Sequence, residues 1–335
     1  MKVAFADNFI GRRGSAVALY DFAHYNETIL GNESIILIPK DHEQNDAGAI
    51  QKFKDRFQCF EHEWGNIDQA DAIIKEQGAD VFYQVKGCMS DFQSRIVPNL
   101  IHMLFINTPE HYHGDQFAFI SDWLSDLCKQ RYGLDKQSVP WMIDLPEVDG
   151  DLRAELGIPD DAFVFGYHGG VDCFGIPWVA EPIHQALKQR DNLYILLMNI
   201  DKSWTSINYN HPRLKFLPGT ADMNRKVQFI QTCDAMLHAR HHGETFGLSC
   251  GEFSMLGRPV VAATTVEDRC HIEILGNKLV GYSNPEELFT ILMSIDSDFV
   301  NSQDWDCYSE RFSPEAVMKK FKEVFLDPYD KKDLT

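Results

Sequence analysis

The sequence predicts an α/β fold made of two parallel-sheet domains of similar size. Short apolar runs bounded by turn residues alternate with stretches of helical spacing, which is typical of parallel sheets with helices on both faces. A seam at 141–151 (WMIDLPEVDGD) lacks this periodicity, and the alternation starts again after it. The length of 335 residues also fits two domains, at about 100–200 residues each. We therefore place the division between residues 147 and 148.

The N-terminal half opens with an apolar run at 3–6, a turn at 11–14 and helical spacing over 15–30. A second helix is expected over 67–77. We expect it to end before Gly78, because glycine is common just after the last residue of a helix. Further expected elements are strands at 34–38, 57–60, 81–85 and 100–106 and a polar helix at about 45–56.

The C-terminal half repeats the pattern. The expected strands are 162–166, 193–198, 214–216, 235–238 and 260–263, and helices are expected around 183–188, 227–232 and 247–256. Near the end, Ser313-Pro314 has the form of a helix N-cap followed by proline at the first helical position. The helix that follows carries an apolar face made of Val317, Phe321, Val324 and Phe325.

Composition excludes several classes of function. The chain has 31 Lys and Arg against 50 Asp and Glu, a net charge of −19, so its surface repels nucleic acid and anionic lipid. No apolar run approaches the roughly 18 residues that a membrane span needs, and the first residues do not have the form of a signal peptide. The eight cysteines include no C-x-x-C pair and indicate a reducing compartment. We expect a cytoplasmic protein with no transmembrane segment and no nucleic-acid partner.

The segment 237–261 carries the chemistry. A strand, a glycine-rich turn and a helix follow one another there, and a helix N-terminus offers free N–H groups that hold phosphate. We expect Gly243, Gly247 and Gly251 to let a ligand approach the backbone. Glu244 precedes the helix and Glu252 lies about one and a half turns inside it. Two carboxylates on either side of a phosphate site suit a nucleotide sugar, with its sugar, diphosphate and ribose.

Glu244 and Glu252 form an E-x7-E motif, and the chain resembles the retaining glycosyltransferases of family 4, which have the GT-B fold. The resemblance extends to the glycine-rich loop at 11–15, the segments 151–159 and 215–219, and the closing helix. It implies two Rossmann-like domains with parallel sheets facing across a cleft. Residues 1–147 would bind the acceptor, 148–312 would bind the nucleotide sugar, and 313–335 would cross back to the first domain.

The resemblance implies a metal-independent hexosyl- or pentosyltransferase that moves a sugar from a nucleotide-diphosphate sugar to a hydroxyl of a glycan, lipid or small molecule. Glu244 would contact the donor sugar as a catalytic residue, and Glu252 would bind the ribose hydroxyls. The backbone after Glu244 would hold the diphosphate, through Thr245, Phe246, Gly247 and Leu248. Gly14, in the first glycine-rich loop, is a further donor-binding candidate.

The sequence departs from the family at the expected phosphate clamp. Gly169-Gly170 stands where a Gly-Arg pair is usual, and no lysine precedes Gly175. A diphosphate beside carboxylates needs cations or many N–H donors. Arg240 is our candidate for the missing cation, with His168 and the backbone N–H groups of Gly169 and Gly170 as further donors.

The N-terminal half offers a second catalytic candidate and several acceptor-side candidates. The family often places a histidine at the cleft near the run His111-Tyr112-His113-Gly114, and we favour His113 as this residue, with His102 as its competitor. Arg12 and Arg13 are adjacent cations that would attract a diphosphate or an anionic acceptor.

Other interpretations remain open. The histidines at 238, 241 and 242 suggest zinc only weakly, because alternate strand side chains point to opposite faces and no distant ligand pair stands out. The missing clamp leaves room for a non-catalytic relative that binds nucleotide sugars. An epimerase or a phosphorylase with the same fold is a further alternative.

Overall fold

The computed structural model describes residues 1–87, 89–106, 108, 112–207 and 209–330. Cys88 and His111 therefore lie outside the described residues. The chain forms two compact units, one of Met1–Met142 with Arg311–Thr335 and the other of Ile143–Glu310. The division falls five residues before the predicted one, inside the non-periodic seam. Each unit is described below by itself.

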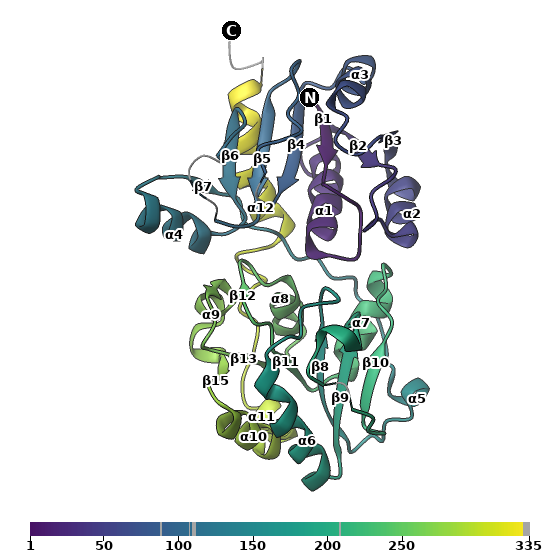
Figure 1. The fold of residues 1–335 in the computed structure, drawn as a ribbon, viewed down its shortest axis with the longest axis vertical. Coiled ribbons are helices and arrows are strands. Elements are labelled where there is room, and N and C mark those ends of the chain that lie inside the picture. Colours follow the sequence, from purple (N-terminus) through teal and green to yellow (C-terminus); the bar gives the residue numbers. More distant parts are fainter. Residues whose placement is uncertain (88, 107, 109–111, 208, 331–335) are drawn as a thin grey trace. The chain divides into compact units, whose positions relative to one another are not determined.

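Unit 1 is built on a seven-stranded sheet in the order β3-β2-β1-β4-β5-β6-β7, in which every strand pair is parallel (Figure 1). The strands are β1 (Lys2–Ala6), β2 (Glu33–Pro39), β3 (Gln58–His62), β4 (Val81–Lys86), β5 (Asn99–Met103), β6 (Gln116–Phe119) and β7 (Gln137–Ser138). The helices between them are α1 (Gly14–Thr28), α2 (Ala47–Arg56), α3 (Ile67–Gln77) and α4 (Asp122–Tyr132). Strands β4 and β5 are buried along their whole length, as expected for central strands covered on both faces.

The chain returns to unit 1 with α12 (Pro314–Phe321), which continues as η5 (Lys322–Leu326) and η6 (Asp327–Tyr329). The Ser313 side chain accepts a hydrogen bond from the Ala316 N–H and caps the helix. On the apolar face, the Phe321 ring stacks on Phe22 of α1 with centroids 5.0 Å apart. The buried face of α12 therefore completes the core of this unit.

Unit 2 contains a six-stranded parallel sheet in the order β10-β9-β8-β11-β13-β15. Its strands are β8 (Phe163–His168), β9 (Leu193–Met198), β10 (Leu214–Leu217), β11 (Ala235–His238), β13 (Val260–Ala263) and β15 (Val280–Tyr282). Two short strands, β12 (Gly243–Glu244) and β14 (Asp268–Arg269), pair separately. The helices are α5 (Arg153–Leu156), η2 (Pro177–Val179), α6 (Ala180–Gln189), η3 (Lys202–Trp204), α7 (Met223–Thr232), α8 (Leu248–Met255), α9 (Cys270–Leu275), η4 (Gly276–Lys278), α10 (Pro285–Ser294) and α11 (Ser297–Val300).

Both sheets have the same order in their first four strands. The first strand of each unit, β1 or β8, lies between the second and the fourth strand of that unit. This reversal of strand order creates a switch point, where ligands bind outside the carboxyl ends of the strands. The predicted α/β fold with two Rossmann-like units is confirmed.

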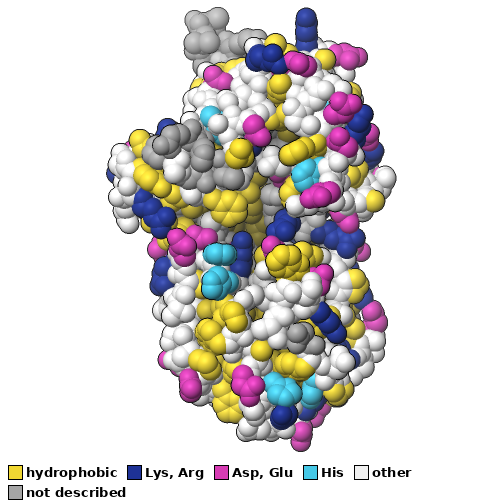
Figure 2. All heavy atoms as spheres, viewed as in Figure 1, with side chains coloured by type: hydrophobic (Ala, Val, Ile, Leu, Met, Phe, Trp, Pro, Cys, Tyr) yellow, Lys and Arg dark blue, Asp and Glu magenta, His cyan; other side chains and the backbone are white. Residues whose placement is uncertain are grey.

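The surface carries both signs of charge. On the face drawn in Figure 2, Lys and Arg side chains are scattered among Asp and Glu side chains. No helix within the described ranges combines the length and the apolar character that crossing a membrane requires. The seven described cysteines are all free thiols.

Candidate functional site

The strongest candidate site lies where β11 leads into α8 in unit 2. The strand ends at His238, β12 pairs with β14, and Gly247 at φ 93° begins the turn into the helix. The first N–H groups of α8 have no partner within the helix and present partial positive charge. Glu244 lies before this helix start and Glu252 lies in the middle of α8, as predicted.

Glu244 is held by a cation and a histidine. Its carboxylate lies 2.5 Å from the Arg240 guanidinium and 3.0 Å from Nε2 of His238. Burial alone would raise the pKa of Glu244, but Arg240 and His238 outweigh burial and lower it to about 2. Glu244 also raises the pKa of Arg240. Both groups are therefore charged at neutral pH.

Glu252, like Glu244, lies beside a cation and a histidine. Only 3% of the residue is exposed. One carboxylate oxygen is paired with Nζ of Lys226 from α7, and the other lies 2.8 Å from Nε2 of His168 at the end of β8. Burial would raise the pKa of Glu252, but Lys226 and His168 lower it to about 2. The carboxylate is thus ionised. Lys226 donates a hydrogen bond to it, and His168 lies at ion-pair distance without hydrogen-bond geometry.

Lys226 is the residue of this candidate site that sequence reasoning missed. It is a second cation of the site, beside Arg240. Lys226 and Glu252 are 26 positions apart and meet only through the packing of α7 against α8. A lysine on an amphipathic helix has no motif of its own, so no local signal pointed to it.

The two glutamate clusters meet at β8. The Tyr167 ring lies 5.7 Å from that of His238, which binds Glu244, and the next residue, His168, binds Glu252. His271 of α9 is fully buried beside His238, with ring centroids 4.8 Å apart. Burial lowers the pKa of His271 to about 3, so its ring is neutral. No motif in the sequence pointed to His271.

The glycines of this segment are closely surrounded by protein atoms. A Cβ on Gly251 would lie 2.1 Å from the Ile143 side chain, and one on Gly243 would lie 2.0 Å from the carbonyl oxygen of Asp268. A Cβ on Gly247 would lie 3.0 Å from that of His271. Contacts within the protein therefore already disfavour a side chain at each of these positions.

The remaining donor-side candidates surround the same strand ends. Gly169 and Gly170 follow β8, and the Gly169 carbonyl accepts a hydrogen bond of 2.7 Å from the Asn199 side chain. Thr245 and Phe246 are buried, and the Phe246 ring packs edge-on against Tyr308. Leu248 is the first residue of α8. Thr245, Phe246 and Leu248 lie between the two glutamates in the chain, whereas Gly14 begins α1 in unit 1.

His102 lies in the core of unit 1. This residue of β5 is fully buried, and its ring nitrogens lie 2.5 Å from the Tyr83 hydroxyl and 2.7 Å from the Val139 carbonyl oxygen. Burial lowers the pKa of His102 to about 4. A ring with both nitrogens bonded to protein has a structural role, so we withdraw His102 as an acceptor-side residue.

The other unit 1 candidates lie in loops. Arg12 forms an ion pair of 2.8 Å with Asp46, whose side chain caps α2. Arg13 is the N-cap residue of α1, and His113 is half-buried in the loop before β6. The pairing with Asp46 gives Arg12 a local structural partner in addition to any ligand.

Within the described part of the chain, no three His, Cys, Asp or Glu side chains gather as a metal ion would require.

Comparison with known proteins gives the fold. No family model matches the chain, and no curated protein matches it. HepE from Anabaena, solved in complex with UDP-glucose, superposes with a TM-score of 0.72 at 17% identity, over 96% of this chain and 98% of HepE. A glycosyltransferase from Rickettsia africae gives a TM-score of 0.66 at 14% identity, over 97% and 99% of the two chains. A protein from Listeria monocytogenes assigned as a UDP-N-acetylglucosamine 2-epimerase gives 0.63 at 14% identity, over 98% and 97%. The chain thus shares the GT-B fold of these proteins along its whole length.

Proposed function

We propose that the chain is a retaining glycosyltransferase that takes a sugar from a nucleotide-diphosphate sugar and transfers it to an acceptor hydroxyl. The observation that carries the proposal is the pair of ionised, oriented glutamates, Glu244 and Glu252, around the N-terminus of α8. The fold is shared with a protein that was crystallised with UDP-glucose, which supports the same class of donor.

Each group of the candidate site would contact a different part of a nucleotide-sugar donor. The Glu252 carboxylate would accept hydrogen bonds from the ribose hydroxyls, because it is ionised and fixed by Lys226 and His168. The diphosphate would lie at the start of α8, against the backbone of residues 245–248. Glu244 would face the sugar. Arg240 and Lys226 each pair with one glutamate, so the helix N–H groups would share the diphosphate charge with Arg240.

The reaction breaks the bond between the anomeric carbon and the diphosphate oxygen, and the electron pair leaves with the diphosphate. Arg240 and the helix N–H groups would stabilise this leaving group, so the proposed reaction needs no metal cofactor. The acceptor hydroxyl then bonds to the anomeric carbon from the same face and passes its proton to the departing diphosphate oxygen on that face. His113 is the proposed unit 1 residue that orients the sugar or the acceptor.

Product analysis tests the proposal. The protein would be incubated with uridine- and guanosine-diphosphate sugars and a panel of glycan, lipid and small-molecule acceptors, and the products followed by NMR. The proposal expects a glycoside with the anomeric configuration of the donor. A product of inverted configuration would contradict retention, and turnover in none of the combinations would favour a binding protein that has lost catalysis.

A second candidate is a sugar-nucleotide epimerase, favoured by the likeness to the Listeria protein. The same NMR experiment distinguishes the two functions. An epimerase would convert the nucleotide sugar to its epimer without any acceptor and without releasing nucleoside diphosphate. A transferase would release the diphosphate in proportion to the transferred sugar.

A further inference from the structure

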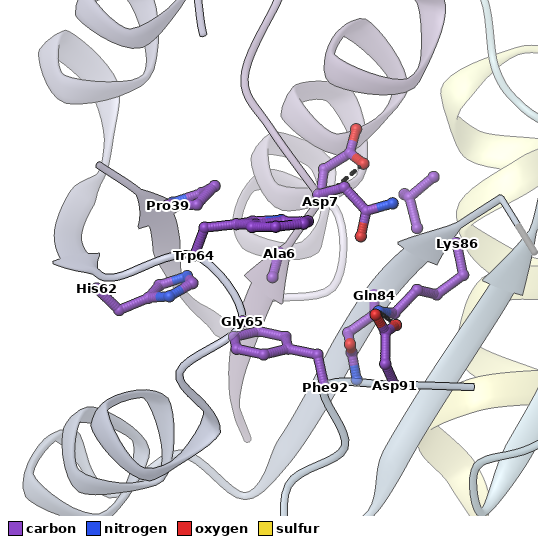
Figure 3. Close-up of a pocket in the computed structure, with 12 residues that line it drawn as sticks. Ala6, Asp7, Pro39, His62, Trp64, Gly65, Gln84, Lys86, Asp91 and Phe92 are labelled. Carbon is purple, nitrogen blue, oxygen red and sulfur yellow. Dashed lines mark hydrogen bonds and ion pairs between the residues drawn. The ribbon is translucent and has the colours of Figure 1, made fainter. Parts of the chain in front are cut away.

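A cavity in unit 1 is lined by none of the residues assigned above to the donor site. It lies at the carboxyl ends of β1, β2, β3 and β4, at the switch point of this sheet, and encloses about 480 Å³ of space that no atom fills, partly open to solvent (Figure 3). Open α/β sheets bind ligands at such a position. The side chains around it come from four strand ends and the loops after them, and their chemistry limits what can bind.

The first limit comes from two buried hydrogen-bond acceptors that have no protein donor. Oε1 of Gln84 and Nε2 of His62 have no hydrogen-bond partner among the described residues, and these residues are 1% and 2% exposed. The amide nitrogen of Gln84 faces the Asn99 side-chain oxygen, so the carbonyl oxygen is the free end. Nδ1 of His62 lies 2.8 Å from the Glu63 carbonyl oxygen and must carry the proton, which leaves Nε2 as an acceptor.

A third acceptor lies across the cavity. The Asp7 carboxyl accepts from the Asn8 N–H at Oδ1, 2.7 Å away, and is also hydrogen-bonded by the Ser15 side chain, but Oδ2 has no partner of good geometry in the described chain. A buried acceptor without a donor is unfavourable, so all three atoms call for a ligand that brings hydrogen-bond donors. Hydroxyl groups and amines are the two common choices.

Charge separates these two choices. Lys86, 2% exposed, lies in the cavity wall and pairs with the more exposed Asp91 at 2.9 Å. Its ammonium disfavours a cationic ligand, while Asp7 and Asp91 disfavour an anionic one. A neutral ligand with several hydroxyl groups fits both conditions.

Aromatic rings supply the apolar part of the wall. Trp64 is 60% exposed at the cavity, and the Phe92 ring stacks on His62 with centroids 5.0 Å apart. Phe92 has a φ of 54°, an unfavourable value for this residue type that is found mainly at binding and active sites. In Figure 3 the Trp64 and Phe92 rings lie at two levels with His62 between them. Such rings pack against the C–H faces of a sugar.

We propose that this cavity binds a neutral sugar, whose hydroxyls donate to Gln84, His62 and Asp7 and whose ring packs on Trp64. Identifying this sugar as the terminal residue of the glycosyl acceptor rests on the proposed function, whereas the binding site itself does not.

The test is a titration of the full chain with neutral mono- and disaccharides, followed by saturation-transfer NMR without nucleotide. Sugars would be added to about 50 mM, where a millimolar Kd is saturated. We expect saturable binding that weakens at least about tenfold in Trp64→Ala and in Gln84→Met. Trp204→Ala is the matched control, because Trp204 is 64% exposed in unit 2 and does not line the cavity. Unchanged thermal unfolding of each variant would establish that it is folded.

Three results would overturn the proposal: no saturable binding of any neutral sugar, wild-type affinity in both cavity variants, or a preference for phosphorylated or amino sugars over the neutral parents. A parallel titration with UDP and UDP-glucose separates this proposal from the proposed function. Nucleotide binding without sugar binding would refute only the cavity site, and sugar binding without nucleotide binding would refute only the donor site.

Discussion

Glu252 is buried and ionised at the same time, and its titration has a measurable consequence. Its folded-state pKa is about 2 against an ordinary 4.5, so the unfolded chain takes up the proton first as the pH falls. The stabilisation is complete above about pH 4.5 and is lost as the pH falls toward 2, by about 3 kcal/mol. Glu252→Gln should therefore show a shallower fall of unfolding free energy across this window, measured by urea denaturation.

Glu286→Gln, at an exposed glutamate of α10, is the control for general acid effects. Equal slopes for the wild type and both variants would mean that the folded environment does not hold Glu252 ionised.

Arg240 is expected to act on the diphosphate. Arg240→Gln should weaken the binding of nucleoside diphosphates by about 1.5–3 kcal/mol, the range for a hydrogen bond to a charged group, and leave nucleoside binding unchanged. Calorimetric titration with UDP and uridine measures both affinities. Arg225→Gln is the matched control, because Arg225 pairs with Glu155 at the surface. An equal loss for UDP and uridine would make Arg240 a residue that only supports Glu244.

Sequence alone identified the two glutamates and Arg240, because these three residues belong to one continuous segment. It also named His168, from the strand where the phosphate clamp was expected. It did not foresee that Arg240 and His168 would each pair with a glutamate, nor that Lys226 would. Those contacts depend on how β8, α7 and α8 pack. His102 was misjudged for a similar reason, since a polar residue in a short strand does not reveal that Tyr83 and Val139 bond both of its nitrogens.

At the level of elements, the two glycines that flank α8 should respond differently to substitution. Gly247 and Gly257 have φ values of 93° and 70°, so alanine is strained at both, by about 1–3 kcal/mol. Only at Gly247 would the new Cβ also meet a neighbour, His271 at 3.0 Å, whereas Gly257 faces open space. Gly247→Ala should lower the unfolding free energy more than Gly257→Ala in denaturant titrations. The reverse order would contradict the described packing of α8 on α9.

The closing helix should be essential to unit 1. Phe321→Ala removes a fully buried ring that contacts Phe22, Tyr83 and Phe325, and should lower the unfolding free energy by about 3–5 kcal/mol. Lys319→Ala, on the exposed face of the same helix, should change it by less than about 0.5 kcal/mol. Similar effects of the two substitutions would show that α12 does not pack on this core.

Elements with continuous apolar runs or clear caps were predicted well, because burial and capping leave a local pattern. The helix over 67–77 agrees in both bounds with α3, and the Ser313 cap starts α12 as expected. The short strands β6, β7 and β15 and the helix α4 were missed, since brief or mixed sequences carry little periodicity. The helix α10 had a usable signal that we did not use, Asn284 followed by Pro285 at the helix start.

At the scale of the whole molecule, one strand plan occurs twice, and the chain matches HepE over 96% of its length at only 17% identity. The fold therefore tolerates almost complete exchange of residues and does not specify a reaction. The sequence indicated the fold. It could not indicate the unit 1 cavity, because Asp7, His62 and Gln84 come together only when the four strands β1 to β4 pair.

The most direct test of the donor site is a thermal-shift titration of the wild type and Glu252→Gln with nucleoside diphosphates of each base and their sugar conjugates. One base should stabilise the wild type by about 2.7 kcal/mol at about 100 times its Kd. Glu252→Gln should weaken this binding by about 1–3 kcal/mol, because the ribose loses a charged hydrogen-bond acceptor. No shift with any nucleotide, or equal shifts for both proteins, would contradict the assignment of Glu252 and α8 as a nucleotide-sugar site.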